Sequence, residues 1–128
     1  MGTARQFHQQ TVHFLRKGFT YADNGTTLTV GTIPAGSVII KPMSGVHVAT
    51  VFNAGTNNFM DVGTTATADL FGTDLSLLTA TFVPLDEAIG GYVVAADTTV
   101  TMLLQLSGTA ATTGAGELII CYVPDIDG

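Results

Sequence analysis

Residues 98–123 read TTVTMLLQLSGTAATTGAGELIICYV, and this stretch decides the fold class. Two runs in which apolar residues alternate with other residues, Thr98–Ser107 and Glu117–Val123, flank a linker made only of glycine, alanine and threonine. Such alternation is the pattern of a β-strand, because successive side chains point to opposite faces of a sheet. The sequence therefore predicts two antiparallel strands joined as a hairpin, with Leu106 opposite Leu118.

The predicted hairpin is apolar on both of its faces. One face carries Met102, Leu104 and Leu106 with their partners on the second strand. The opposite face carries Thr101, Leu103, Gln105, Ile119, Cys121 and Val123. A strand in a two-layer sandwich needs only one apolar face for the core, so this second face is a candidate subunit interface. The alternative is that the two strands are central in their sheet and covered by loops.

The rest of the chain has the same β-rich character. The sequence holds 21 threonines and 15 glycines, more than a quarter of its 128 residues. Threonine suits a half-exposed strand and glycine suits turns. Turn signals return roughly every ten residues, while the 3.6-residue helical period is nearly absent. The sequence predicts an all-β, jelly-roll-like β-sandwich domain over residues 18–128, preceded by an extended N-terminal arm over residues 1–17.

Two further hairpins are expected from local turn signals. Asn24-Gly25 favours a type I′ turn, because both residue types accept a positive φ, and Gly55-Thr56 is the second turn. Residues 64–78 lack strand alternation and predict a short helical turn capped by Asp69 or Asp74. The two turns set the expected registers, which are Phe19 with Val30, Tyr21 with Leu28, Phe52 with Phe59 and Val51 with Met60.

The chain is poor in charge. Its 4 basic and 10 acidic side chains amount to 11% of the residues, against about 25% in an average soluble domain. We therefore expect part of the surface to be covered by a partner. Residues 1–17 carry +3 and residues 18–128 carry −9, which sum to the net charge of −6. An acidic body does not suit a nucleic-acid partner, and no apolar run approaches the ~20 residues that span a membrane.

The N-terminal arm is a candidate contact with neighbouring subunits. Its apolar side chains alternate with other residues, so the arm can add as a strand to the sheet edge of a neighbour. Its basic side chains can touch an acidic surface. The predicted contact residues are Arg5, Val12, Phe14, Leu15, Arg16 and Lys17. Two alternatives stay open: a first strand of the same sandwich, or a solvated basic tail.

No motif for catalysis, metal binding or cofactor binding stands out in the sequence. The histidines His8, His13 and His47 lack metal-ligand spacing, and the single cysteine, in the middle of an apolar strand, is interpreted as a small buried residue. A cupin-type enzyme needs clustered histidine and glutamate ligands, whereas the chain has 3 histidines and 2 glutamates. We therefore expect a protein that is not an enzyme and holds no cofactor or metal. With no tryptophan, a sugar-stacking platform would have to use Tyr21, Tyr92 or Tyr122.

Three segments carry a resemblance to a protein family. They are GTIPAGSVII at 31–40, VFNAGTNNFMDVGT at 51–64 running into ADLF at 68–71, and residues 98–108 with 116–123. In their order they resemble the capsid cement or decoration proteins of tailed bacteriophages, which have a jelly-roll body.

The resemblance implies a structural virion protein. It implies binding and stabilisation of the outer capsid surface as a homo-oligomer, typically a homotrimer, with an arm that reaches neighbouring subunits. The implied partners are the major capsid protein and further copies of the chain, and the implied location is the virion, assembled in the host cytoplasm. Similar strings occur in phage tail and fibre modules, so binding of a host surface glycan is the alternative function.

Overall fold

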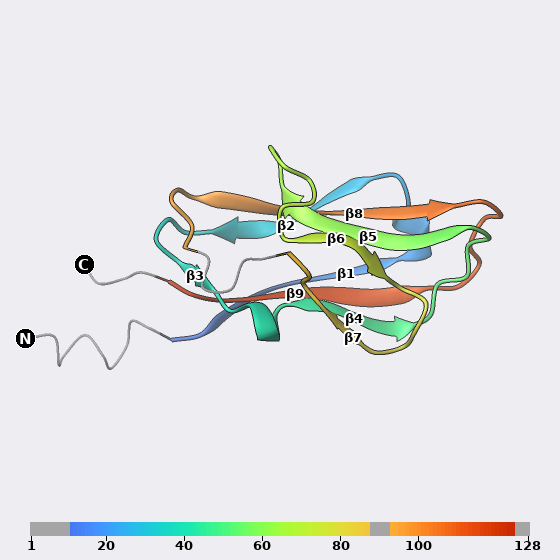
Figure 1. Cartoon of the computed structure of the whole chain (residues 1–128), viewed down its shortest axis with the longest axis horizontal. Coiled ribbons are helices and arrows are strands. Elements are labelled where there is room, and N and C mark those ends of the chain that lie inside the picture. The colour runs from blue at the N-terminus through green and yellow to red at the C-terminus, as the bar shows by residue number, and fades with distance from the viewer. Residues whose placement is uncertain (1–10, 88–92, 125–128) are drawn as a thin grey trace, which may run out of the picture.

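The computed structural model describes residues 11–87 and 93–124, which form two antiparallel sheets packed face to face (Figure 1). The five-stranded sheet has the order β1-β9-β4-β7, and the short strand β3 also pairs with β9. The four-stranded sheet has the order β2-β8-β5-β6. Two single turns of 3₁₀ helix, η2 (Tyr21–Asp23) and η3 (Lys41–Met43), lie between strands. The strand bounds are β1 His13–Thr20, β2 Thr27–Ile33, β3 Val38–Ile39, β4 Gly45–Thr50, β5 Asn57–Thr64, β6 Gly72–Ser76, β7 Phe82–Pro84, β8 Thr98–Ser107 and β9 Ala115–Val123.

The strand order is that of a jelly roll. Among the described residues, β5 and β6 are the only consecutive strands that pair with each other. The connections from β1 to β2, β4 to β5, β6 to β7 and β8 to β9 all pass from one sheet to the other. Two interlocked Greek keys of this kind define the double-sheet jelly roll. The predicted all-β sandwich is confirmed.

The core lies between the two sheets and is built by the alternation visible in the sequence. In β8 and β9, every second residue points inward, as Met102 and Leu104 do in one sheet and Leu118 and Ile120 in the other. The ring of Phe19 stacks on that of Phe52, with 5.7 Å between the centroids. Packed apolar layers of this kind are the main stabilising contribution in a β-sandwich.

The predicted hairpin between β8 and β9 is wrong. Leu106 is opposite Asn58 of β5, whereas Leu118 is opposite Val46 of β4 and Lys17 of β1. The linker between the two strands carries the chain across the sandwich from one sheet to the other. Both runs are apolar strands, as expected, but each finds its hydrogen-bonding partners in a different sheet.

The turn at Asn24-Gly25 is not the centre of a hairpin either. Asn24 has φ −57° and Gly25 has φ +82°, and the Thr26 N–H donates to the Asp23 carbonyl over 3.3 Å. These angles define a type II turn, not a type I′ turn. Both groups of the Asn24 amide are engaged by Leu106: its Nδ2 donates to the carbonyl and its Oδ1 accepts from the N–H. The side chain thus fixes the turn to β8 of the second sheet.

Two more local predictions are corrected. Phe52 and Phe59 do not pair, because β4 and β5 belong to different sheets and Phe59 is opposite Ser76 and Gln105. Residues 64–78 contain strand β6 and no helical turn. Asp74 has φ +51° and lies within β6, so it does not cap a helix.

Candidate interaction surfaces

The six predicted interface residues lie on opposite sides of the molecule. Those of β8 point out from the four-stranded sheet, and those of β9 point out from the five-stranded sheet. Thr101 is 5% exposed and Cys121 is fully buried within the single chain, while the other four are half-buried. The residues of β8 and β9 therefore belong to two surfaces, and an interface role for either set stays a prediction.

The predicted contact residues of the arm fall largely on β1. Arg5 lies outside the described residues. Residues 13–17 pair with β9, so the described part of the arm forms the first strand of the sandwich, which was the alternative considered from the sequence. Leu15 points inward and packs against the core, beside Gly31 of β2. Val12, Phe14, Arg16 and Lys17 are exposed.

One half of the outer face of the five-stranded sheet is apolar. Val123 of β9 is opposite Val38 of β3, and Val38 forms an isolated bridge with Val93. Extending the register between β1 and β9 by one residue places Val12 opposite Val123 on its other side. In the next row, Phe14 is opposite Cys121. We call the set Val12, Phe14, Val38, Val93 and Val123 the valine face.

The valine face is open to solvent. Val12, Phe14, Val38 and Val93 are 41%, 48%, 37% and 57% exposed. Side chains of opposite residues in a sheet lie on the same side, so the four valines form one row across the strands. The row lies at the end of the sandwich where β1 begins and β9 ends (Figure 1). The four valines are far apart in sequence. Val123 was in the predicted interface on the second face of β9, and Val12 and Phe14 were among the predicted contact residues of the arm.

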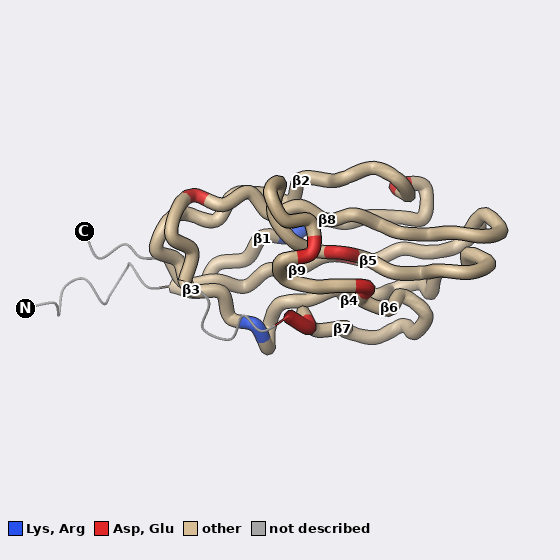
Figure 2. The backbone as a smooth tube through the Cα atoms, turned by 45° about the horizontal axis from the view of Figure 1, so that its top comes forward, with Lys and Arg blue, Asp and Glu red and all other residues tan. Residues whose placement is uncertain are grey.

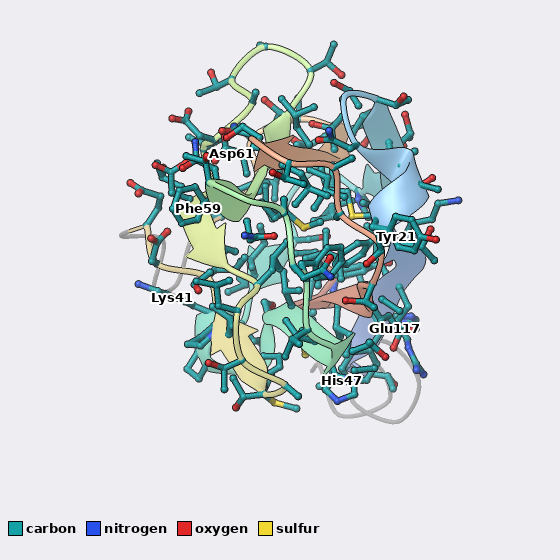
Figure 3. All side chains as sticks on the ribbon, turned by 90° about the vertical axis from the view of Figure 1, so that its right-hand side faces the viewer. Tyr21, Lys41, His47, Phe59, Asp61 and Glu117 are labelled. Carbon is teal, nitrogen blue, oxygen red and sulfur yellow. The ribbon has the colours of Figure 1, made fainter. Side chains whose placement is uncertain are left out.

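The other half of the same outer face is charged and polar. The Arg16 guanidinium forms two hydrogen bonds with the Glu117 carboxylate, Nη2 to Oε1 over 2.8 Å and Nε to Oε2 over 3.1 Å. This carboxylate raises the pKa of Arg16 through the hydrogen bonds first and its charge second. Glu117 is also opposite His47, and Figure 3 shows both at the same side of the sandwich. Exposed ion pairs of this kind contribute little to folding stability.

The outer face of the four-stranded sheet is mostly polar without being strongly charged. Asp61 accepts a hydrogen bond from the Asp74 N–H over 2.9 Å and another from the Gln105 amide. Asp61 and Phe59 lie on the side of the sandwich opposite His47 and Glu117 (Figure 3). Most of the remaining outward residues of β2 and β8 are threonines with free or weakly bonded hydroxyls, as in the pair Thr32–Thr99 at 3.5 Å.

The described residues assemble no group of three histidine, cysteine or acidic side chains able to hold a metal ion. His13 stacks on Tyr122 with 5.7 Å between the ring centroids, and His47 points outward from β4. His8 lies outside the described residues. Burial raises the pKa of the Cys121 thiol, which keeps it protonated and a poor nucleophile.

A depression of about 230 Å³ lies beside η2 and the β8–β9 connection. Tyr21, 40% exposed, lines it together with Asn24 and residues 106–111. Of the three tyrosines considered as a sugar platform, Tyr122 is buried and Tyr92 lies outside the described residues. Among the described tyrosines, Tyr21 is therefore the one exposed ring on which a glycan could stack. In the described part of the chain no helix is long and apolar enough to cross a bilayer.

Solved structures with the same fold come from phage capsids. A chain of the cyanophage Pam1 capsid asymmetric unit matches with a TM-score of 0.69 and 13% sequence identity, over 91% of this chain and 87% of that chain. A chain of the acidic stable capsid structure of Helicobacter pylori bacteriophage KHP30 matches with a TM-score of 0.67 and 15% identity, over 90% and 89%. No protein-family model and no curated protein match the sequence. At these identities the likeness establishes a shared fold over nearly the full length of each chain.

Proposed function

We propose that this chain is a structural protein of a tailed-phage virion, which binds and stabilises the outer surface of the capsid as a homotrimer. Its partners are the major capsid protein and further copies of itself. The observation that carries the proposal is the match of the whole jelly roll, about nine-tenths of both chains, to chains of two phage capsid structures. A match over this share of both chains favours a similar building unit.

Surface composition supports the same proposal. A chain with 11% charged residues leaves wide areas of its outer faces without an ionic group, as Figure 2 shows along the strands. The valine face adds exposed apolar side chains, and their transfer out of water into an interface lowers the free energy. Both features suit a protein that functions against other protein surfaces.

The test uses capsids of the phage that encodes the chain. Capsids from a deletion mutant are mixed with the purified protein, pelleted, and heated to find the temperature at which they release DNA. We expect saturable binding in multiples of three copies and release at a temperature several degrees higher than for bare capsids. An unrelated β-sandwich protein of similar charge is the control. Absence of the chain from purified virions, or no binding to the deletion capsids, would refute the proposal.

The second candidate function is a tail or fibre module that binds a host surface glycan. It is favoured by one observation, the exposed Tyr21 ring on the rim of a depression. The exposed face of an aromatic ring is an apolar surface on which a sugar ring can stack. Binding on a glycan array that is lost in Tyr21→Ala and kept in Tyr21→Phe would support this function over capsid binding.

A further inference from the structure

We infer that the valine face is the contact between neighbouring copies of this chain. The inference rests on the proposed homo-oligomer and adds to it which surface joins the copies. The face crosses four strand positions, from Val12 before β1 through Val123 and Val38 to Val93. It is therefore a continuous surface and not a scatter of single exposed residues.

The charge pattern of the face favours a second copy as its occupant. Near a rotation axis the same residues of each copy approach one another, so a charged side chain there would meet its own like charge. Among their paired positions, the rows through Val123 and Cys121 carry no charged side chain. The nearest charges are Lys41 of η3, which follows Ile40 beside Cys121, and the pair Arg16–Glu117 in the rows beyond. A neutral face close to the axis therefore suits an identical copy, because no side chain there meets its own like charge.

The size of the face fits the centre of an oligomer interface. Four strand positions ~4.8 Å apart and two rows of side chains ~7 Å apart give the valine face roughly 270 Å². A standard interface buries about 800 Å² on each partner, with an apolar core and a polar rim. The valine face can supply that core, and Arg16 with Glu117 lies where the rim would be.

Substitution of two exposed valines tests the contact. Val38→Asp and Val93→Asp place a carboxylate in the row, and both residues are exposed enough for the single chain to fold. In sedimentation equilibrium at about 10 μM we expect each variant to raise the dissociation constant of the oligomer more than tenfold. Thr29→Asp, on the outer face of the four-stranded sheet, is the matched control and should leave the constant unchanged. Circular dichroism melting verifies that each variant is folded.

Cysteine cross-linking gives a second measurement that does not depend on weakening the oligomer. Val93→Cys is expected to form a disulfide between copies under mild oxidation, whereas Thr29→Cys and the wild-type chain, whose Cys121 is fully buried, should stay uncross-linked. An oligomer that persists in both aspartate variants, with no cross-link at Val93→Cys, would overturn the inference and leave the proposed trimer intact. A wild-type chain that is monomeric would overturn the inference too, while capsid pelleting decides separately whether it binds capsids.

Discussion

Gly114 lies where the β8–β9 connection meets the core. Its φ of +143° is a conformation that side-chain-bearing residues rarely adopt. A Cβ at this position would overlap the ring of Phe52, which itself stacks on Phe19. The absence of a side chain therefore lets the connection close over the stacked aromatic pair.

Substituting Gly114 by alanine is expected to destabilise the fold strongly. Backbone strain and overpacking each cost ~1–3 kcal/mol, so we expect a loss near 3 kcal/mol and a melting temperature lower by roughly 10 °C. Gly18→Ala is the matched control, because a Cβ there meets nothing closer than the Gly116 carbonyl oxygen at 3.8 Å. Melting followed by circular dichroism measures both. Equal melting temperatures for the two variants would contradict the packing described for Gly114.

For single residues, the sequence indicates where a connection lies but not which distant residues it contacts. Residues 108–116 consist only of glycine, alanine and threonine, a composition that gives no sign of core packing, yet Gly114 is buried. The connection is also fixed by Asn53, whose Oδ1 accepts from the N–H groups of Thr112 and Thr113 over 2.8 and 3.1 Å. Asn53 is about 60 residues from Thr112 and Thr113 in the sequence, and no local sequence pattern predicts these hydrogen bonds.

For the strands, the sequence predicted their positions correctly and their pairing wrongly. Alternation predicted β8 and β9 correctly as strands, because a strand with one buried face has apolar side chains at every second position. Pairing was predicted wrongly, because a turn signal marks where a strand ends and does not say which sheet the next strand joins. In this jelly roll nearly every connection crosses the sandwich, so hairpin registers inferred from Asn24-Gly25 or Gly55-Thr56 fail together.

Engineered disulfides distinguish the two pairings. Thr29 and Thr101 are opposite each other on β2 and β8, within the Cα separation that a disulfide spans. We expect Thr29→Cys with Thr101→Cys to form a bond in the folded chain. The control pair, Gln105→Cys with Ile119→Cys, is opposite in the predicted hairpin but lies on the two outer faces of the sandwich. Mass spectrometry after mild oxidation measures both, and a bond in the control pair alone would contradict the sheet order.

For the whole molecule, fold class and low charge were accessible from composition, whereas the valine face was not. Its members Val12, Val38, Val93 and Val123 come from four separate segments, and only the pairing of β3 with β9 and the bridge to Val93 bring them together. A surface of this kind depends on topology, which is set by contacts between residues far apart in the chain.

The proposed association of copies should depend little on salt. Raising the ionic strength from 0.05 to 0.5 M shortens the screening length from roughly 14 to 4 Å, which weakens contacts between charges but not burial of apolar surface. If the neutral valine face joins the copies, we expect the dissociation constant of the oligomer to change by less than about threefold over this range, measured by sedimentation equilibrium. If the basic residues near the N-terminus, Arg5 and Lys17, joined them to an acidic partner surface instead, the constant would rise more than tenfold. Lys17→Gln provides the control: it should leave the constant unchanged at both salt concentrations, because Lys17 is opposite the inward-pointing Leu118 and so lies on the other side of β1 from Phe14.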